Sequence, residues 1–332
     1  MISEEVQTAD KVMVAKANAI KLDRKKRLSG DIIFRSLTIL FALSILVIIL
    51  LMVVEMIQES LPAMKIFGWK FMTTSTWDAV QGEFGALPFI WGSVISSILA
   101  ILLATPLSVG AALFITEIVP RRIGAVIASL AELLAAIPSV IYGLWGVLVM
   151  APWLQGSVEP FLIDHFGAIP FFRGAPYGVS MLAAILILMI MIVPIITSIT
   201  KEVIMAVPTS QREAAVALGA TRWEMIRTAV LPYGKSGILG AVILGLGRAI
   251  GETMAVTMVI GNTPRISMSL LDPGYTMPSV IANEFAEASS KLHSAALMEI
   301  GIMLLFVTLI INMLARLLLW SITRGEKGGG RI

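Results

Sequence analysis

The sequence predicts an all-α integral membrane protein that crosses the bilayer six times, and three observations lead to this prediction. Only 14% of the 332 residues are charged and 57% are apolar, whereas soluble domains carry about 25% charged residues. Six apolar runs are long enough for a helix to cross about 30 Å of hydrocarbon. Most of the 25 Lys and Arg residues fall in segments that these crossings would bring to one side of the membrane. The composition excludes a soluble globule, a disordered chain and a coiled coil.

The expected crossings, in chain order, are residues 36–54, 91–115, 133–150, 177–200, 236–260 and 297–320. No early apolar segment interrupts the polar and basic residues 1–35, so the first crossing should remain as an anchor and not be cleaved as a signal peptide. The uncharged run 84–116 contains Pro88 and Pro106 and is longer than one straight crossing requires. We therefore expect a re-entrant or surface piece before the second crossing.

The positive charges predict the orientation. They are concentrated in residues 1–35, in the loop 201–235 and near the C-terminus, and such charges favour the cytoplasmic side. Both termini and the loop should therefore be cytoplasmic. The expected parts are a basic N-terminal tail (1–35), a six-span domain (36–320) and a C-terminal tail (321–332). With no Cys and only His165 and His293, no metal or catalytic centre built from Cys or His is expected.

The cytoplasmic loop 201–235 carries two signals for helix N-termini. Ser210 and Glu213 have the spacing of a capping box, in which each side chain satisfies a backbone group of the other residue, and so do Thr221 and Glu224. Gly219 lies between the two signals, where a left-handed glycine commonly ends a helix. We expect two short helices joined by a glycine elbow, with the second helix ending at residue 230. Neither helix is long enough to be stable alone, so each should pack against the spans or a partner.

The same loop resembles the EAA loop of ABC importer permeases, whose pattern is EAA-x3-G-x9-I-x-LP. The matching residues are Glu213, Ala214, Ala215, Gly219, Leu231 and Pro232. Ala229 stands where the family usually has Ile. The resemblance implies the type I ABC importer permease fold. It also implies that the loop docks into a cleft of a separate ATP-binding subunit and carries the motion of that subunit to the spans.

Other interpretations of the loop have less support. Glu213 taken alone could be only a helix cap. A DNA-binding helix-turn-helix has a similar elbow, but this loop lies between two crossings and has few Lys and Arg to neutralise phosphates. Residues 229–236 nearly match a P-loop, with Ala229 in place of the first Gly. A helix and not a strand precedes them, so no ATP site is expected on this chain.

Arg248 is the strongest single indication of function. It lies 12 residues after Ser236, or about 18 Å along a helix, which would place it near the middle of the bilayer. An Arg there costs about 2.5–3.5 kcal/mol on insertion scales and needs a partner, a wet cavity or an anionic ligand. Glu252 follows one turn later, and Gly247 and Gly251 have the Gly-x-x-x-Gly spacing that lets a second helix approach closely.

Two interpretations of these charges stay open. Arg248 and Glu252 could simply neutralise each other. Alternatively, Arg248 could offer a planar pair of donors to an oxyanion in a hydrated pathway, with Glu252 preventing binding that is too tight. Glu132, at the cytoplasmic end of the third crossing, belongs to the same polar route or merely sits at a helix end.

A further segment, residues 247–254, resembles the permeases of ABC phosphate importers. Two others, residues 136–146 and 279–285, resemble the PstC branch of these permeases in particular. This resemblance implies a non-enzymatic subunit of an inorganic phosphate importer in the bacterial plasma (inner) membrane. It implies a homologous permease partner, PstA, two copies of the ATPase PstB, and the binding protein PstS, which delivers phosphate from outside. ATP and Mg would be bound by the ATPase, with no cofactor on this chain and no contact with nucleic acid.

The expected mechanism is alternating access, driven by ATP binding to the partner ATPases. Three rivals remain: a permease for sulfate, molybdate or another oxyanion; a passive anion channel or ion-coupled carrier that uses Arg248 and Glu252 as gate or proton relay; and a membrane scaffold without transport. A channel needs no ATPase dock, and a scaffold leaves Arg248 without a role.

Overall fold

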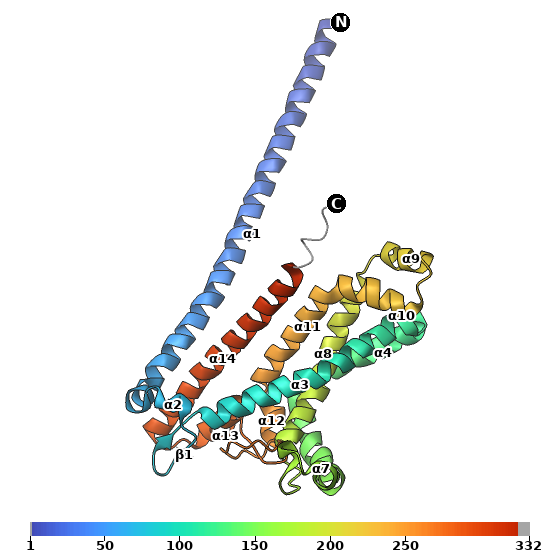
Figure 1. Ribbon diagram of the computed structural model, residues 1–332. Helices are drawn as coiled ribbons and strands as arrows, with labels where there is room; N and C mark the ends of the chain where they lie inside the picture. Colours follow the sequence, from blue (N-terminus) through green and yellow to red (C-terminus); the bar gives the residue numbers. More distant parts are fainter. Residues whose placement is uncertain (1, 325–332) are drawn as a thin grey trace. The chain divides into compact units, whose positions relative to one another are not determined.

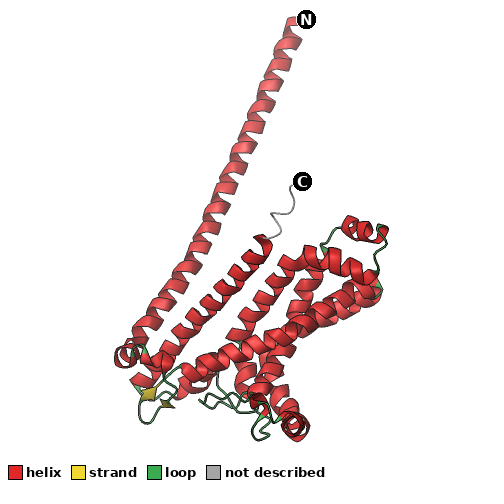
Figure 2. Cartoon of the chain, viewed as in Figure 1, coloured by secondary structure: helices red, strands yellow, loops and turns green. Residues whose placement is uncertain are grey.

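The computed structural model describes the backbone of residues 2–324 and the side chains of residues 31–321. It forms two compact units, which divide after Gln58. The C-terminal tail expected at 321–332 lies outside the described residues from position 325 onward. The side chains of the basic N-terminal tail lie outside the described side chains up to position 30. Figure 2 shows that the described chain is almost entirely helical, as the composition predicts.

The first unit consists of most of helix α1 (Ile2–Phe67). The segment of α1 that is apolar enough to cross a membrane runs from Asp31 to Phe67, so the expected crossing at 36–54 lies inside it. The prediction of a separate tail over residues 1–35 missed that the backbone of residues 2–35 is helical and continuous with the crossing. The helix also continues to Phe67 past Pro62, beyond the expected end at residue 54.

Within the described residues, six helical segments are long and apolar enough to cross a membrane, which confirms the expected number. The segments after α1 are Leu87–Ile118, Ser139–Phe166, Met181–Met205, Arg222–Gly251 and Lys291–Ser321. The second segment consists of α3 (Leu87–Leu113) and the π-helical turn η1 (Phe114–Ile118). The fourth is α8 (Met181–Met205) and the sixth lies in α14 (Lys291–Arg324).

The expected re-entrant piece in the run 84–116 is wrong, because α3 and η1 form one continuous helical segment. Pro88 lies in the first turn of α3, where its missing N–H would have no partner in the helix anyway. Pro106 is accommodated inside the helix. The residues just before α3 form a small antiparallel hairpin of β1 (Trp77–Asp78) and β2 (Glu83–Phe84), in which Trp77 pairs with Phe84.

The third crossing was placed too early. Residues 133–135 belong to a separate helix, α4 (Arg121–Ala135), and Pro138 precedes α5 (Ser139–Trp145). A proline disfavours helical geometry in the residue before it, so the apolar run is divided at this point. From α5 the helical path continues through η2 (Gly146–Met150), α6 (Ala151–Trp153), η3 (Leu154–Val158) and α7 (Glu159–Phe166).

Helix α8 is the centre of the second unit, and it packs against α3, α4 and α11 (Leu231–Gly251). Figure 1 shows α3 running across α8 and α11. Small residues permit this close packing: a Cβ on Gly245 of α11 would lie 2.7 Å from Cδ1 of Ile196 on α8. Buried hydroxyls add polar contacts, since Ser108 Oγ of α3 donates to the Val193 carbonyl at 3.2 Å.

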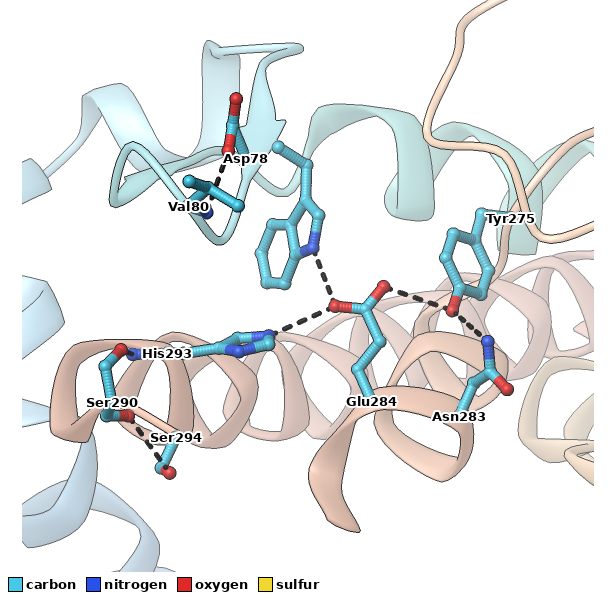
Figure 3. A network of polar contacts seen from close by, with 9 residues as sticks. Asp78, Val80, Tyr275, Asn283, Glu284, Ser290, His293 and Ser294 are labelled. Carbon is cyan, nitrogen blue, oxygen red and sulfur yellow. Dashed lines mark hydrogen bonds and ion pairs between the residues drawn. The ribbon is translucent and has the colours of Figure 1, made fainter. Parts of the chain in front are cut away.

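A second cluster lies where the hairpin meets α13 (Met277–Glu284) and α14. Its buried members include Phe84, Phe89 and Tyr275. The Glu284 carboxylate is the shared hydrogen-bond partner of polar side chains in this cluster. Figure 3 shows it between the side chains of His293 and Tyr275. The elbow helix α9 (Thr209–Ala217) lies at the opposite end of α8 (Figure 1).

Candidate coupling loop and intramembrane charges

The loop between α8 and α11 forms the expected glycine elbow. Helix α9 ends at Ala217, and Gly219 follows with a φ of +87° in the left-handed region. Thr221 then caps α10 (Arg222–Met225): its Oγ1 accepts from the Glu224 N–H at 3.4 Å, and Glu224 Oε2 accepts from the Thr221 N–H at 2.8 Å. The second capping box and the left-handed glycine are thereby confirmed.

The first capping box is wrong. Helix α9 begins at Thr209, with Pro208 in the capping position, so Ser210 lies inside the helix and caps nothing. Pro208 explains the shift, because its fixed φ of −58° and ψ of 138° start the helix directly after it. Glu213 is therefore an exposed residue of α9 and has no capping role.

The second elbow helix does not end at residue 230. It passes through the π-helical turn η5 (Ile226–Val230) into α11, which begins at Leu231. The Leu231 N–H donates to the Ile226 carbonyl, and this wide turn precedes Pro232, which has no N–H to donate. The near-match to a P-loop at 229–236 is therefore helical throughout.

The elbow has a packed side and an exposed side. Ala215 packs against an apolar cluster formed by Ala112, Leu113, Ile204, Val207, Met225, Ile226 and Val230. On the exposed side are Glu213, Val216, Leu218 and Trp223, which we call the elbow face; Leu218 is 90% exposed. The packed side agrees with the expectation that helices this short need neighbours to be stable. The elbow face stays exposed, so a partner has access to it.

Arg212 anchors the elbow, although it was not among the residues predicted from the sequence. Its Nη2 donates to Glu117 Oε1 at 2.9 Å and to the Ile204 carbonyl at 2.8 Å, and its Nη1 donates to the Val207 carbonyl. Glu117 lies in η1, 95 residues earlier in the chain. No local spacing links these two residues, so only the fold brings them together.

Arg248 lies in the last turn of α11, three residues before the helix ends at Gly251. The expected depth was counted from Ser236, but α11 begins at Leu231, so that count does not measure the position of Arg248 along its helix. The side chain is exposed. Within the described side chains it forms no hydrogen bond or ion pair.

Glu252 is separated from Arg248 by the end of the helix. Its backbone is extended (φ −70°, ψ 125°), and α12 (Met254–Val259) begins after Thr253. Glu252 Oε1 accepts from the Ala255 N–H at 3.3 Å, at the positive end of the α12 dipole. The side chain is 9% exposed. Among the described ion pairs none joins Glu252 to Arg248, so the neutralised-pair interpretation is not supported.

The region around Arg248 contains the three segments that carry the second resemblance. Tyr142 of α5 lies within electrostatic range of Arg248, and its hydroxyl donates to the Leu134 carbonyl at 2.8 Å. Helix α5 packs closely on α12, since a Cβ on Gly143 would lie 3.0 Å from Cα of Ala255. Helix α12 in turn packs against α13. Residues 136–146, 247–254 and 279–285 therefore form one continuous region.

The remaining expected residues are placed as follows. Glu132 lies in the last turn of α4, where it accepts from Lys201 Nζ of α8 at 2.9 Å. This pair joins α4 to α8, and Glu132 makes no described contact with Arg248 or Glu252.

Gly247 faces α14, where its Cβ would lie 3.8 Å from Asn312 Oδ1, but a Cβ on Gly251 would meet nothing within 4 Å. Only one of the two glycines therefore faces a neighbouring helix of this chain.

Comparison with known proteins identifies the family. Residues 104–322 match the family described as the binding-protein-dependent transport system inner membrane component. The phosphate transport system permease protein PstC of Mesorhizobium japonicum is 46% identical over 88% of this chain and 90% of its own length. The protein of that name from Haemophilus influenzae is 41% identical over 89% of this chain and 95% of its length. PstC 2 of Mycobacterium tuberculosis is 36% identical over 91% and 96%.

Solved structures show the same fold at low sequence identity. The inward-facing MetNI methionine ABC transporter aligns with a TM-score of 0.52 and 15% identity, over 70% of this chain and 94% of that chain. A bacterial ABC transporter that imports the polysaccharide alginate aligns with a TM-score of 0.52 and 19% identity, over 79% and 88%. The fold is that of the type I ABC importer permeases. The chain therefore belongs to the family of binding-protein-dependent transport system inner membrane components, as a multi-pass membrane protein.

Proposed function

We propose that this chain is a permease subunit of an ATP-driven importer for inorganic phosphate. The main support for this proposal is the similarity to proteins named as phosphate transport system permeases, at 46% identity over 88% of the chain. The region around Arg248 supports it chemically. A permanently charged guanidinium offers paired donors that fit a phosphate oxyanion.

Arg248 and the break after α11 would form this chain's half of the translocation pathway. An unwound segment between two helices at the substrate site is a recurrent feature of transporters, and here α11 ends at Gly251 and α12 begins at Met254. Arg248 is exposed on this chain, which leaves it free to face a pathway shared with a second permease. Glu252 holds the start of α12 in place and adds a negative charge that opposes very tight anion binding.

The elbow face would couple this pathway to ATP hydrolysis on another subunit. Glu213, Ala214, Ala215, Gly219, Leu231 and Pro232 would serve as the coupling residues. The elbow is held to the spans on one side, while Glu213 and Leu218 are exposed on the other. A rigid elbow can transmit displacement, whereas a flexible loop would absorb it. With the elbow in the cytoplasm, as the positive charges favour, ATP binding would move the elbow and the spans would switch access to Arg248.

The proposed assembly contains a homologous permease, PstA, two copies of the ATPase PstB and the binding protein PstS. ATP and Mg would belong to the ATPase, and this chain would supply no cofactor and catalyse no bond chemistry. A planar guanidinium also fits sulfate and molybdate, so the identity of the oxyanion is the part of the proposal that needs the sharpest test.

The test is uptake of labelled phosphate by the complete complex in proteoliposomes, with unlabelled sulfate, molybdate or phosphate as competitors. We expect only unlabelled phosphate to suppress the signal at equal concentrations. Equal suppression by sulfate or molybdate would assign the complex to another oxyanion. Uptake that continues when the ATPase is inactive would favour a passive channel.

A further inference from the structure

We propose that Arg212 is the positioning residue that transmits movement of the elbow to two spans at once, an inference that rests on the proposed coupling function. The structural basis is the pair of anchors that its guanidinium holds together. One anchor is Glu117, in the turn that ends the α3 segment. The other is the C-terminal end of α8, through the carbonyls of Ile204 and Val207.

We call the contacts of Arg212 with Glu117, Ile204 and Val207 the joint. The geometry of these contacts is suited to a rigid link. The Arg212 and Glu117 side chains are 21% and 10% exposed, so the pair is largely shielded from water and from screening by salt. A guanidinium presents its donors in a fixed planar fork. Because this fork reaches two elements, Arg212 cannot rotate without breaking contacts to both.

The two carbonyls that Arg212 contacts lie at the C-terminal end of α8: Ile204 is in its last turn, and Val207 follows two residues after the helix ends at Met205. The last carbonyls of a helix have no partner within the helix and carry the negative end of its dipole. Arg212 supplies a positive charge and donors at this point, and Glu117 balances the charge. The guanidinium therefore contacts both the negative end of α8 and the carboxylate of Glu117.

The rest of the elbow offers no equivalent link. Ala215 contributes apolar packing, which is non-directional and lets surfaces slide. Among the described ion pairs, Arg212–Glu117 is the one that joins α9 to a span. The neighbouring Glu213 is exposed. A displacement applied to the elbow face would thus reach α3 and α8 through the guanidinium of the residue just before Glu213.

The experiment measures phosphate uptake and ATP hydrolysis in the same preparation of complete complex. Arg212→Gln should leave hydrolysis in place and lower the uptake per ATP hydrolysed by about tenfold, within the usual range for coupled sites. Arg212→Lys, which keeps the charge but not the fork, should give an intermediate ratio. Arg227→Gln is the matched control, because Arg227 is an exposed arginine of the same loop, and its ratio should be unchanged.

Glu117→Gln keeps the contacts of Arg212 with α8 and removes only the charge pair to the α3 segment. It therefore tests the role of Arg212 even if Arg212→Gln fails to assemble. It should assemble normally and still show a lowered ratio. An unchanged ratio in either assembled variant overturns the joint while leaving the proposed function intact. Absence of ATP-driven phosphate uptake by the unmodified complex would instead overturn the proposed function, and the joint with it.

Discussion

The indole nitrogen of Trp77 donates to Glu284 Oε2 at 2.9 Å, across 207 residues of sequence. The same carboxylate oxygen lies 3.1 Å from Nε2 of His293, and Oε1 accepts from the Tyr275 hydroxyl at 3.2 Å (Figure 3). One side chain of α13 thereby holds the β-hairpin and the start of α14. This explains how the segments before the second crossing and before the sixth form a common structure.

Replacing Glu284 should destabilise this structure. Glu284→Ala leaves the buried hydroxyl of Tyr275 and the half-buried indole N–H of Trp77 without their acceptor, and an unsatisfied buried donor costs about 1–3 kcal/mol. We expect a clear drop in the thermal unfolding midpoint of the detergent-solubilised protein. Glu287→Ala is the control, because Glu287 is exposed three residues later, and its midpoint should stay close to that of the unmodified protein. Equal midpoints for the two variants would show that the network contributes nothing.

The stability of this cluster should fall in alkaline solution. Burial raises the pKa of Tyr275 above the usual value of about 10, although the Asn283 hydrogen bond partly opposes the shift. Above pH 10 the unfolded chain releases the phenolic proton while the folded protein still holds it, so unfolding becomes more favourable as pH rises. We expect the unfolding midpoint to decline above pH 10 by more than in Tyr275→Phe. Parallel pH profiles for the two proteins would contradict this.

Two glycines of α3 should respond differently to the same substitution. A Cβ on Gly92 would lie 2.0 Å from the Tyr275 carbonyl oxygen, whereas a Cβ on Gly110 would meet nothing within 4 Å. Backbone atoms cannot move aside as a flexible side chain can. Gly92→Ala should therefore greatly reduce the yield of folded protein, and Gly110→Ala should be neutral, as size-exclusion chromatography would show. Normal folding of Gly92→Ala would mean that α3 and Tyr275 are not in close contact.

Gly219→Val should weaken the association with the ATPase subunit. No atom would contact the added Cβ within 4 Å, so the effect comes from the φ of +87° alone, which costs an ordinary residue about 1–2 kcal/mol. Membrane insertion should be normal, and recovery of the ATPase in co-purification should fall. Gly219→Asn is the matched control, since Asn tolerates left-handed geometry better. Undiminished recovery with the Val variant would argue against a rigid elbow.

Arg248→Ala should abolish phosphate uptake while the complex still assembles. Within the described side chains nothing is bonded to Arg248, so its removal should leave the fold intact. Arg248→Lys keeps the charge but not the planar pair of donors, and we expect it to retain a small part of the uptake. Uptake of labelled phosphate by assembled complexes is the measurement. A normal rate in the Ala variant would remove Arg248 from the pathway.

The sequence predicted the features that depend on nearby residues. Six crossings follow from hydropathy, and the positive φ of Gly219 and the Thr221–Glu224 cap follow from signals within a few positions. The Ser210 cap failed because Pro208, directly before α9, starts the helix two residues earlier. The third crossing begins later than predicted for a similar reason, since Pro138 separates α4 from α5.

Long-range polar contacts could not be predicted in this way. Arg212 meets Glu117 across 95 residues and Trp77 meets Glu284 across 207, and neither pair has any spacing that a helix or strand would impose. Glu252 was predicted to lie one helical turn after Arg248 on the same face, but α11 ends at Gly251 and the backbone of Glu252 is extended. Its contact with the start of α12 was missed because the apolar run continues through the break at Glu252, and hydropathy alone does not reveal where that helix ends.

Transport by this chain is proposed to be driven by ATP that is hydrolysed on another subunit. The most direct measurement is accumulation of labelled phosphate against its gradient in proteoliposomes that contain either this chain alone or the complete complex with ATP. We expect accumulation only with the complete complex, and its loss when the ATPase subunit is inactivated. Uphill accumulation by this chain alone would contradict the claim.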